Sequence, residues 1–136
     1  MSRAAPFVHP VSVRYLEVDQ QGVVFNMWYL AYCDDAMTAF LAEGGLPYLD
    51  MLRSGYDAQV VHTELDWHGP LRYGEPAGVR VGVSHLGRTS FTLRFEVLSS
   101  ERLILDASTV YVTVRTDGSG KCDIPPVLLA ALGPVT

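Results

Sequence analysis

A single carboxylate in a short polar loop is the residue with the clearest chemical potential. Asp19 lies in the run Glu17-Val18-Asp19-Gln20-Gln21-Gly22, between a strand-like and a helix-like segment. A helix N-terminus carries unpaired backbone N–H groups and the positive end of the helix dipole. Such groups could polarise an acyl carbonyl, while the carboxylate attacks it or accepts a proton from water. Local chemistry leaves a plain helix cap open as the alternative.

Other polar residues near this loop each have two interpretations. Asn26, at the predicted helix start, could hold water or substrate, or could serve as the N-cap. Glu17 is expected to be a solvated loop carboxylate. Asp34 and Asp35 interrupt an apolar helix, where a buried carboxylate is costly unless paired. We expect structural hydrogen bonds for them, with a place at the active site or at a subunit contact as the alternative.

The histidines do not form a metal-binding pattern. His62 and His68 share one strand face, but six residues of strand separate them by roughly 20 Å. His9 and His85 are isolated in the sequence, so we expect no metal site and no catalytic histidine. A serine nucleophile elbow and a glycine-rich phosphate loop are also missing. Arg88, in a predicted turn, is either solvated or clamps a phosphate.

A strand and a helix must position Asp19. Residues 7–15 show the apolar and polar alternation of a strand. Residues 27–43 are apolar over most of a helical circumference, which predicts a helix inside the structure rather than on its surface. Gly44-Gly45 is a helix stop signal, and a short helix is expected over residues 47–53.

The second half of the chain predicts four strands in antiparallel succession. Alternation covers residues 61–67, 79–83, 91–97 and 103–115, and Pro125-Pro126 is expected to open a short terminal helix. An apolar helix needs a sheet to enclose it. The predicted fold class is α+β, a hotdog fold with a five-stranded antiparallel sheet wrapped around a long central helix. A ferredoxin-like sandwich would need a second full helix within residues 56–116.

Length and composition fit one domain that associates with itself. The chain has 136 residues, of which 49% are hydrophobic and 18% charged, and its net charge is −5. We predict a single domain over residues 1–136. A monomer of this composition has difficulty covering its apolar surface. The acidic balance and the lack of a basic run argue against a nucleic-acid binder.

The cysteines and the N-terminal pattern point to a reducing compartment. Cys33 and Cys122 are far apart and predict neither a disulfide framework nor a metal site. The first residues lack the layout of a signal peptide, and no apolar run reaches the ~20 residues needed to span a bilayer. The cytoplasm is the expected location.

Residues 13–30 resemble the signature of the 4-hydroxybenzoyl-CoA thioesterase-like family of hotdog-fold acyl-CoA thioesterases. That signature runs aromatic, any, acid, any, Asp, two residues, Gly, two aliphatics, aromatic, His/Asn/Tyr, two residues, Tyr. Its fixed points fall on Asp19, Gly22, Asn26 and Tyr29. Similarity over residues 32–36, 70–75 and 86–91 extends the resemblance across most of the chain.

The resemblance implies hydrolysis of an acyl-CoA or acyl carrier protein thioester to free acid and thiol. Asp19 would act as nucleophile or general base, and the backbone at Phe25 and Asn26 would polarise the thioester carbonyl. Substrate contacts are implied for four residues: Gly22, Tyr29, Arg88 and Thr89. Arg88 would contact the phosphates of coenzyme A. Coenzyme A is part of the substrate, so no cofactor and no metal are expected. Relatives form dimers that pair sheets, often tetramers, with active sites at subunit interfaces; a homodimer or homotetramer is therefore expected.

Three positions depart from the family pattern. Glu17 stands where Asp is common, which is expected to be harmless. Met37 stands where many relatives have Arg, and Asn26 where many have His. The last two positions bear on substrate preference and on the finer mechanism.

Two other functions and the choice of acyl group stay open. One is a non-catalytic acyl-binding hotdog protein; the other is a hotdog hydratase or dehydratase, which generally needs an Asp–His pair in one loop. The Asp19 loop contains no histidine. Tyr29, Tyr32 and Trp67 either favour an aromatic acyl group or simply fill the core.

Overall fold

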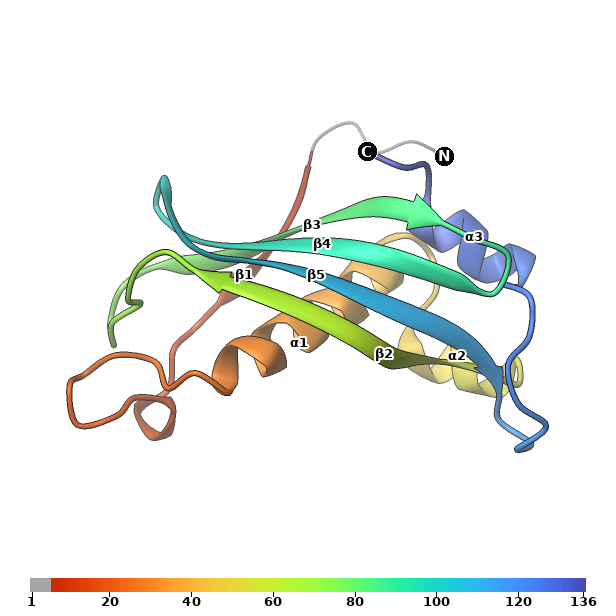
Figure 1. The fold of residues 1–136 in the computed structure, drawn as a ribbon, viewed down its shortest axis with the longest axis horizontal. Helices are drawn as coiled ribbons and strands as arrows, with labels where there is room; N and C mark the ends of the chain where they lie inside the picture. The colour runs from red at the N-terminus through yellow and green to blue at the C-terminus, as the bar shows by residue number, and fades with distance from the viewer. Residues whose placement is uncertain (1–5) are drawn as a thin grey trace.

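One five-stranded antiparallel sheet forms the body of the protein, in the order β1-β3-β4-β5-β2 (Figure 1). The computed structural model describes residues 6–136. The strands are β1 (Phe7–Val11), β2 (Tyr56–Trp67), β3 (Ala77–Leu86), β4 (Ser90–Ser99) and β5 (Arg102–Arg115). The helices are α1 (Trp28–Glu43), α2 (Tyr48–Arg53) and α3 (Pro126–Leu132). The predicted α+β class with a five-stranded antiparallel sheet is confirmed.

In β3, β4 and β5 the apolar positions alternate with polar ones and are buried, as the alternation predicts. In β4 the side chains of Phe91, Leu93, Phe95 and Val97 are buried, whereas Arg94 between them is exposed. Burying a large apolar side chain contributes about 1.5–3 kcal/mol. These strands are therefore anchored by the core that they share with α1.

Helix α1 packs on one face of the sheet instead of being enclosed by it. Its buried side chains recur at helical spacing along a single side, and they are Tyr29, Tyr32, Cys33, Ala36, Met37, Phe40 and Leu41. Leu30, Ala31, Asp34 and Asp35 on the other side are exposed. The expectation of an all-round buried helix is thus not met. The small and charged residues of the exposed side form a one-sided pattern that the high apolar content of the segment concealed.

Strand β1 is shorter than the sequence pattern predicts. Its pairing with β3 ends at Val11 opposite Ala77, although alternation continues to residue 15. The chain leaves the sheet there and makes a 3-10 turn over Tyr15–Glu17. This early exit creates the loop between β1 and α1 that contains Asp19.

Strands β1 and β2 form the two edges of the sheet. Strand β2 pairs with β5 through a register shift between Val60 and His62, and no strand within residues 6–136 pairs with its other edge. The segment that follows β2 returns past the β1–α1 loop at one end of the molecule (Figure 1).

No helix in the described part of the chain is long and apolar enough to cross a membrane.

Candidate active site

The loop that carries Asp19 is a small hairpin closed by backbone hydrogen bonds. Val18 and Val24 form a bridge, and the N–H of Asp19 donates to Val23 O at 2.9 Å. The N–H of Gly22 donates to Asp19 O at 3.0 Å. Gly22 has φ 75°, a left-handed conformation that glycine adopts without a Cβ penalty.

The Asp19 carboxylate is exposed and held by its own turn. Its Oδ1 accepts the N–H of Gln21 at 2.8 Å, and Oδ2 has no hydrogen-bond partner within residues 6–136. Helix α1 has Met27 as its N-cap and no side-chain cap hydrogen bond. Neither Asp19 nor Asn26 therefore caps α1. The N-cap alternative for Asn26 is wrong, whereas the Asp19 side chain caps only the turn that directly follows it.

The start of α1 presents backbone amides beside this hairpin. The N–H of Trp28 donates to Phe25 O at 3.0 Å, and the N–H of Phe25 donates to Glu17 O at 2.9 Å. The amides of Asn26 and Met27 have no acceptor among the residues that the structure describes. Asp19 sits two ladder positions beyond the Glu17–Phe25 pair, which corresponds to roughly 7 Å along the hairpin. A carboxylate and unpaired helix-start amides thus share one small loop.

Glu17 is buried, which contradicts the expectation of a solvated carboxylate. It is 3% exposed, and its carboxylate accepts hydrogen bonds from Arg14 and from Tyr32 Oη, the latter at 2.8 Å. Burial alone would raise the pKa of Glu17, but these hydrogen bonds and the nearby Arg14 charge outweigh it and lower that pKa below its ordinary value. No local signal in the sequence reveals the contact with Tyr32, which lies fifteen residues away.

A second segment holds the hairpin from the β2–β3 connection. Val24 N–H donates to Leu71 O at 2.8 Å, and Tyr73 N–H donates to Gly22 O at 3.2 Å. Val23 and Arg72 form a bridge between the two segments. The sequence of residues 70–75 already resembles the family, but the pairing of this segment with the Asp19 hairpin depends on the fold.

Exposed apolar side chains surround this end of the molecule. Tyr15 and Tyr73 are both exposed, and their rings meet edge to face at 6.1 Å. Four more large apolar side chains of the loop and of the first turn of α1 are exposed: Leu16, Phe25, Met27 and Leu30. Such a concentration of apolar surface is typical of a ligand or subunit contact.

Tyr29 and Tyr32 belong to the core, which supports the core-filling interpretation of these two rings. Tyr29 is 2% exposed, and its ring lies 6.0 Å from that of Tyr32 and 6.5 Å from that of Trp67. Trp67 is about half exposed. Of the three aromatic residues, Trp67 thus offers the most surface to a ligand.

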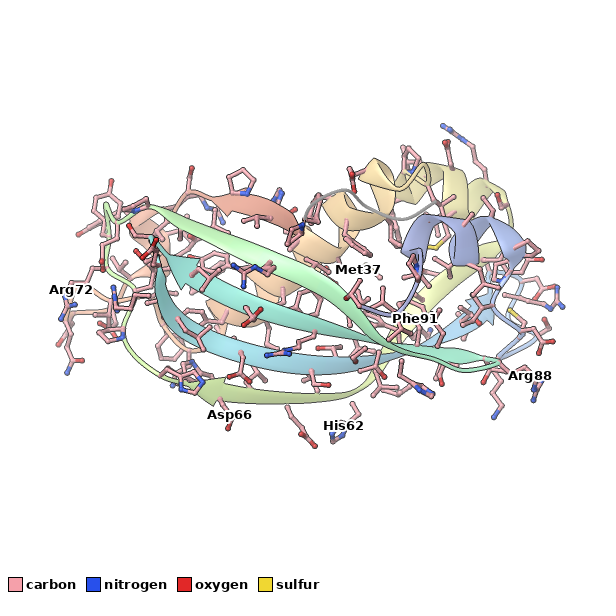
Figure 2. All side chains as sticks on the ribbon, turned by 90° about the horizontal axis from the view of Figure 1, so that it is seen from above. Met37, His62, Asp66, Arg72, Arg88 and Phe91 are labelled. Atoms are coloured by element: carbon pink, nitrogen blue, oxygen red, sulfur yellow. The ribbon has the colours of Figure 1, made fainter. Side chains whose placement is uncertain are left out.

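Arg88 and Thr89 do not lie near Asp19 in the same chain. Figure 2 shows Arg88 at one end of the molecule and Arg72, which pairs with the Asp19 hairpin, at the other. Arg88 forms an exposed ion pair with Asp123. Exposed pairs of this kind contribute about 0–1 kcal/mol, so the guanidinium is easily recruited by another anion.

The remaining polar candidates lie apart from the hairpin tip. Asp35 Oδ2 lies 3.0 Å from His9 Nε2, which confirms a structural partner for that carboxylate. The pKa of Asp34 is raised by partial desolvation of its carboxylate against the protein surface and by the neighbouring charges of Asp35 and Asp57. His62 points away from the helices on β2 (Figure 2). Within the described residues, no group of three or more His, Cys, Asp or Glu side chains is placed to hold a metal ion.

Comparisons with known proteins agree with this architecture. The family model of the thioesterase-like superfamily matches residues 13–132. A putative esterase of Aquifex aeolicus is 28% identical over 93% of this chain and 98% of its own length. A 1,4-dihydroxy-2-naphthoyl-CoA hydrolase of Synechococcus is 24% identical over 84% of this chain and 80% of its own. A solved structure of a hypothetical protein from Thermus thermophilus is 31% identical, with a TM-score of 0.86 over 92% of this chain and 95% of the other.

The matched region spans the Asp19 hairpin, α1 and all of the sheet except β1. Its helix-on-sheet arrangement is shared by the solved structure of a 1,4-dihydroxy-2-naphthoyl-CoA thioesterase from Synechocystis, which is 21% identical, with a TM-score of 0.84 over 94% of this chain and 96% of the other. The chain therefore belongs to the thioesterase-like superfamily of thioester hydrolases.

Proposed function

We propose that this protein hydrolyses an acyl-CoA thioester, or an acyl carrier protein thioester, to free acid and thiol, with Asp19 as nucleophile or general base. The observation that carries the proposal is the hairpin that holds an accessible carboxylate beside the unpaired amides at the start of α1. Hydrolysis of an activated acyl group needs these two features together.

In this mechanism the thioester carbonyl oxygen accepts hydrogen bonds from the Asn26 amide and from the adjacent Met27 amide. The helix dipole and these N–H groups stabilise the negative charge that develops on that oxygen. The amide of Phe25 already donates to Glu17 O. The part of Phe25 in polarising the carbonyl is therefore indirect, because its hydrogen bond holds the neighbouring Asn26 amide in place.

Asp19 then acts in one of two ways. As a nucleophile, its free carboxylate oxygen attacks the carbonyl carbon, the C–S bond breaks, and the thiolate leaves. Water then hydrolyses the remaining mixed anhydride, which releases the acid and regenerates the Asp19 carboxylate. As a general base, the carboxylate removes a proton from water, the resulting hydroxide attacks the carbonyl carbon, and thiol leaves. Both routes yield the same acid and thiol and use only protein groups and water.

The substrate is proposed to be a coenzyme A ester because the relative from Synechococcus is named as a hydrolase of such an ester. Gly22 allows close approach at the turn, and Tyr29 supports the first turn of α1 beneath the acyl site. Trp67 offers an exposed aromatic surface at the same end of the sheet. Activity towards aromatic and aliphatic acyl-CoAs, compared side by side, decides whether the acyl group is aromatic.

A second subunit would bring the two ends of the molecule together. Strand β2 runs from the Arg88 end, where Ala58 pairs with Thr113 and Thr113 N–H donates to Thr89 O, towards the Asp19 end. An antiparallel contact between two β2 edges places the Arg88 end of one chain beside the Asp19 end of the other. We propose that Arg88 and Thr89 bind the phosphates of coenzyme A in this way, across the interface of a homodimer that can pair again into a tetramer.

The test is thiol release from a panel of short, long and aromatic acyl-CoAs, measured for the parent and for Asp19→Asn. We expect kcat to fall at least ~100-fold in the variant, because a principal catalytic group is removed. Asp117→Asn is the matched control, since Asp117 Oδ1 also accepts the N–H two residues on at 2.8 Å but lies elsewhere. The control is expected to keep full activity.

Two outcomes would contradict the proposal. Near-normal turnover of Asp19→Asn would remove Asp19 from the mechanism. Tight acyl-CoA binding by calorimetry, without thiol release from any CoA or carrier-protein thioester, would favour the acyl-binding alternative.

A further inference from the structure

The two oxygens of the Glu17 carboxylate make all their contacts with two residues, Arg14 and Tyr32. Oε1 accepts the Arg14 backbone N–H and the Tyr32 hydroxyl, both at 2.8 Å. Oε2 accepts Arg14 Nε at 2.9 Å and lies 2.9 Å from Arg14 Nη2. Tyr32 belongs to α1, and Arg14 is the residue at which the chain turns towards the hairpin. One buried side chain therefore connects the entry to the loop with the helix.

The main chain of Glu17 extends this connection to the far side of the hairpin. Its carbonyl oxygen accepts the N–H of Phe25 at 2.9 Å, immediately before the Asn26 amide. The Arg14 guanidinium also lies over the Trp28 ring at 5.8 Å from its centroid. Cation–π contact of this kind contributes about 0.5–1 kcal/mol at an exposed site. The clamp formed by Glu17, Arg14 and Tyr32 thus reaches the first turn of α1 as well as its second.

Alternative supports for the base of the hairpin are few on this side. The β2–β3 connection holds the hairpin through Leu71, Arg72 and Tyr73, whereas Glu17 supplies the contacts to α1. A cavity of about 330 Å³ adjoins the clamp and is lined in part by Ser12, Arg14 and Asp35. Val18 and Val24 pack the hairpin against the core, and on the side that faces this space the hydrogen bonds of Glu17 hold its base.

We infer that Glu17 is a positioning residue that fixes the Asp19 carboxylate relative to the helix-start amides, acting together with Tyr32 and Arg14. The inference rests on the proposed role of Asp19 and deepens it. Asp19 follows Glu17 by two residues, so a tilt of the hairpin base moves the carboxylate directly. A misplacement of about 1 Å can lower a rate by ~100-fold. Glu17 itself is buried and does not face the substrate.

The test compares Tyr32→Phe and Glu17→Gln with the parent. Tyr32→Phe removes one donor and keeps the ring in the core, and Glu17→Gln keeps the shape but loses the ion pair with Arg14. We expect kcat to fall roughly 10-fold in the first variant and 10- to 100-fold in the second, with KM within about twofold. Tyr48→Phe is the matched control, since it removes a hydroxyl that donates to Asp57 Oδ2 at 3.2 Å away from the loop, and it should keep kcat.

A double-mutant cycle with Asp19→Asn separates positioning from general loss of structure. If Tyr32 acts through Asp19, the Tyr32→Phe substitution causes no further loss in the Asp19→Asn background, measured as single-turnover thiol release at high enzyme concentration. A loss by the same factor in both backgrounds would overturn the inference, and so would a change in KM alone. If Glu17→Gln does not fold, Tyr32→Phe carries the cycle.

The outcomes also distinguish this inference from the function on which it rests. Loss of activity in Asp19→Asn with normal kcat in Tyr32→Phe and Glu17→Gln overturns the positioning role only. Normal activity in Asp19→Asn overturns both.

Discussion

Asp19 and Asp117 have the same local hydrogen bond and different surroundings. Each accepts the N–H of the residue two positions later at 2.8 Å, and each is exposed next to a turn with a left-handed glycine. Of the two, Asp19 is the one that lies beside the start of α1. At the scale of a single residue, the chemistry proposed for Asp19 therefore depends on its surroundings and not on its own conformation.

Replacing Gly22 tests how much the hairpin turn contributes to stability and to kcat. Its φ of 75° is strained for alanine, although a Cβ would meet no atom within 4 Å. We expect Gly22→Ala to cost about 1 kcal/mol of stability and to lower kcat, because relaxing the strain moves Asp19. Gly118→Ala is the control, since Gly118 has φ 84° and equally open surroundings. Equal kcat in the two variants, with equal loss of Tm, would show that the turn does not position Asp19.

The lowered pKa of Glu17 predicts how the stability of the fold changes as the pH falls. Its hydrogen bonds overcome the effect of burial and lower its folded-state pKa below the ordinary value of 4.5. Glu17 therefore stabilises the fold fully above pH 4.5, and this contribution is lost as the pH falls from that value through the lower folded pKa. Thermal unfolding from about pH 6 to pH 3 should show the gap in Tm between the parent and Glu17→Gln narrowing. A difference in Tm that stays constant over this pH range would mean that the Glu17 carboxylate does not form these hydrogen bonds.

At the scale of elements, α1 packs against the core along its whole length, and its N-terminal half has an additional polar contact. Phe7 and Phe40 meet edge to face at 5.5 Å in the C-terminal half. The hydroxyl of Tyr32 reaches Glu17 in the other half. The helix can thus be disturbed at one end without a direct effect on the other.

Gly44 tests the packing at the C-terminal end of α1. A Cβ at this position would collide with the backbone carbonyl of Ala131 in α3, which cannot move as a side chain does. We expect Gly44→Ala to lower the free energy of unfolding by about 1–3 kcal/mol while kcat per folded molecule stays unchanged.

Gly45→Ala is the neighbouring control. Gly45 has φ 102°, and a methyl group at its Cβ position would meet no atom within 4 Å. Only the backbone strain of about 1 kcal/mol is therefore expected. Chemical denaturation measures both variants. A smaller loss for Gly44→Ala than for Gly45→Ala would show that α1 and α3 are not in close contact.

At the scale of the whole molecule, the two ends carry different parts of the proposed site. The Asp19 hairpin lies at one end and Arg88 at the other (Figure 2). Val60 and Val61 are 53% and 58% exposed on the unpaired edge of β2. A long exposed edge strand with apolar residues is a template for pairing with another chain. Under the proposed function, the single chain would hold only part of the site, and the exposed edge of β2 would pair with a second chain to complete it.

Charge on the β2 edge should prevent this assembly. We expect the parent to sediment as a dimer or tetramer of the 14.9 kDa chain, and Val60→Lys/Val61→Lys to sediment near the monomer mass with reduced thiol release. Val8→Lys on β1, at the opposite edge of the sheet, is the control and should keep the parental mass. A parent that is monomeric and fully active in sedimentation and kinetic assays would contradict the shared site.

The sequence by itself determined the strands β3 to β5, the extent of α1 and the Asp19–Gly22 turn, because these depend on periodicity and on the backbone freedom of neighbouring residues. Only the tertiary structure decided that Glu17 is buried against Tyr32, that residues 71–73 support the hairpin, and that Arg88 lies at the far end. It also decided that α1 is covered on one side. These features arise from contacts between segments far apart in the chain, and such contacts depend on how the sheet and helix pack, which no local pattern specifies.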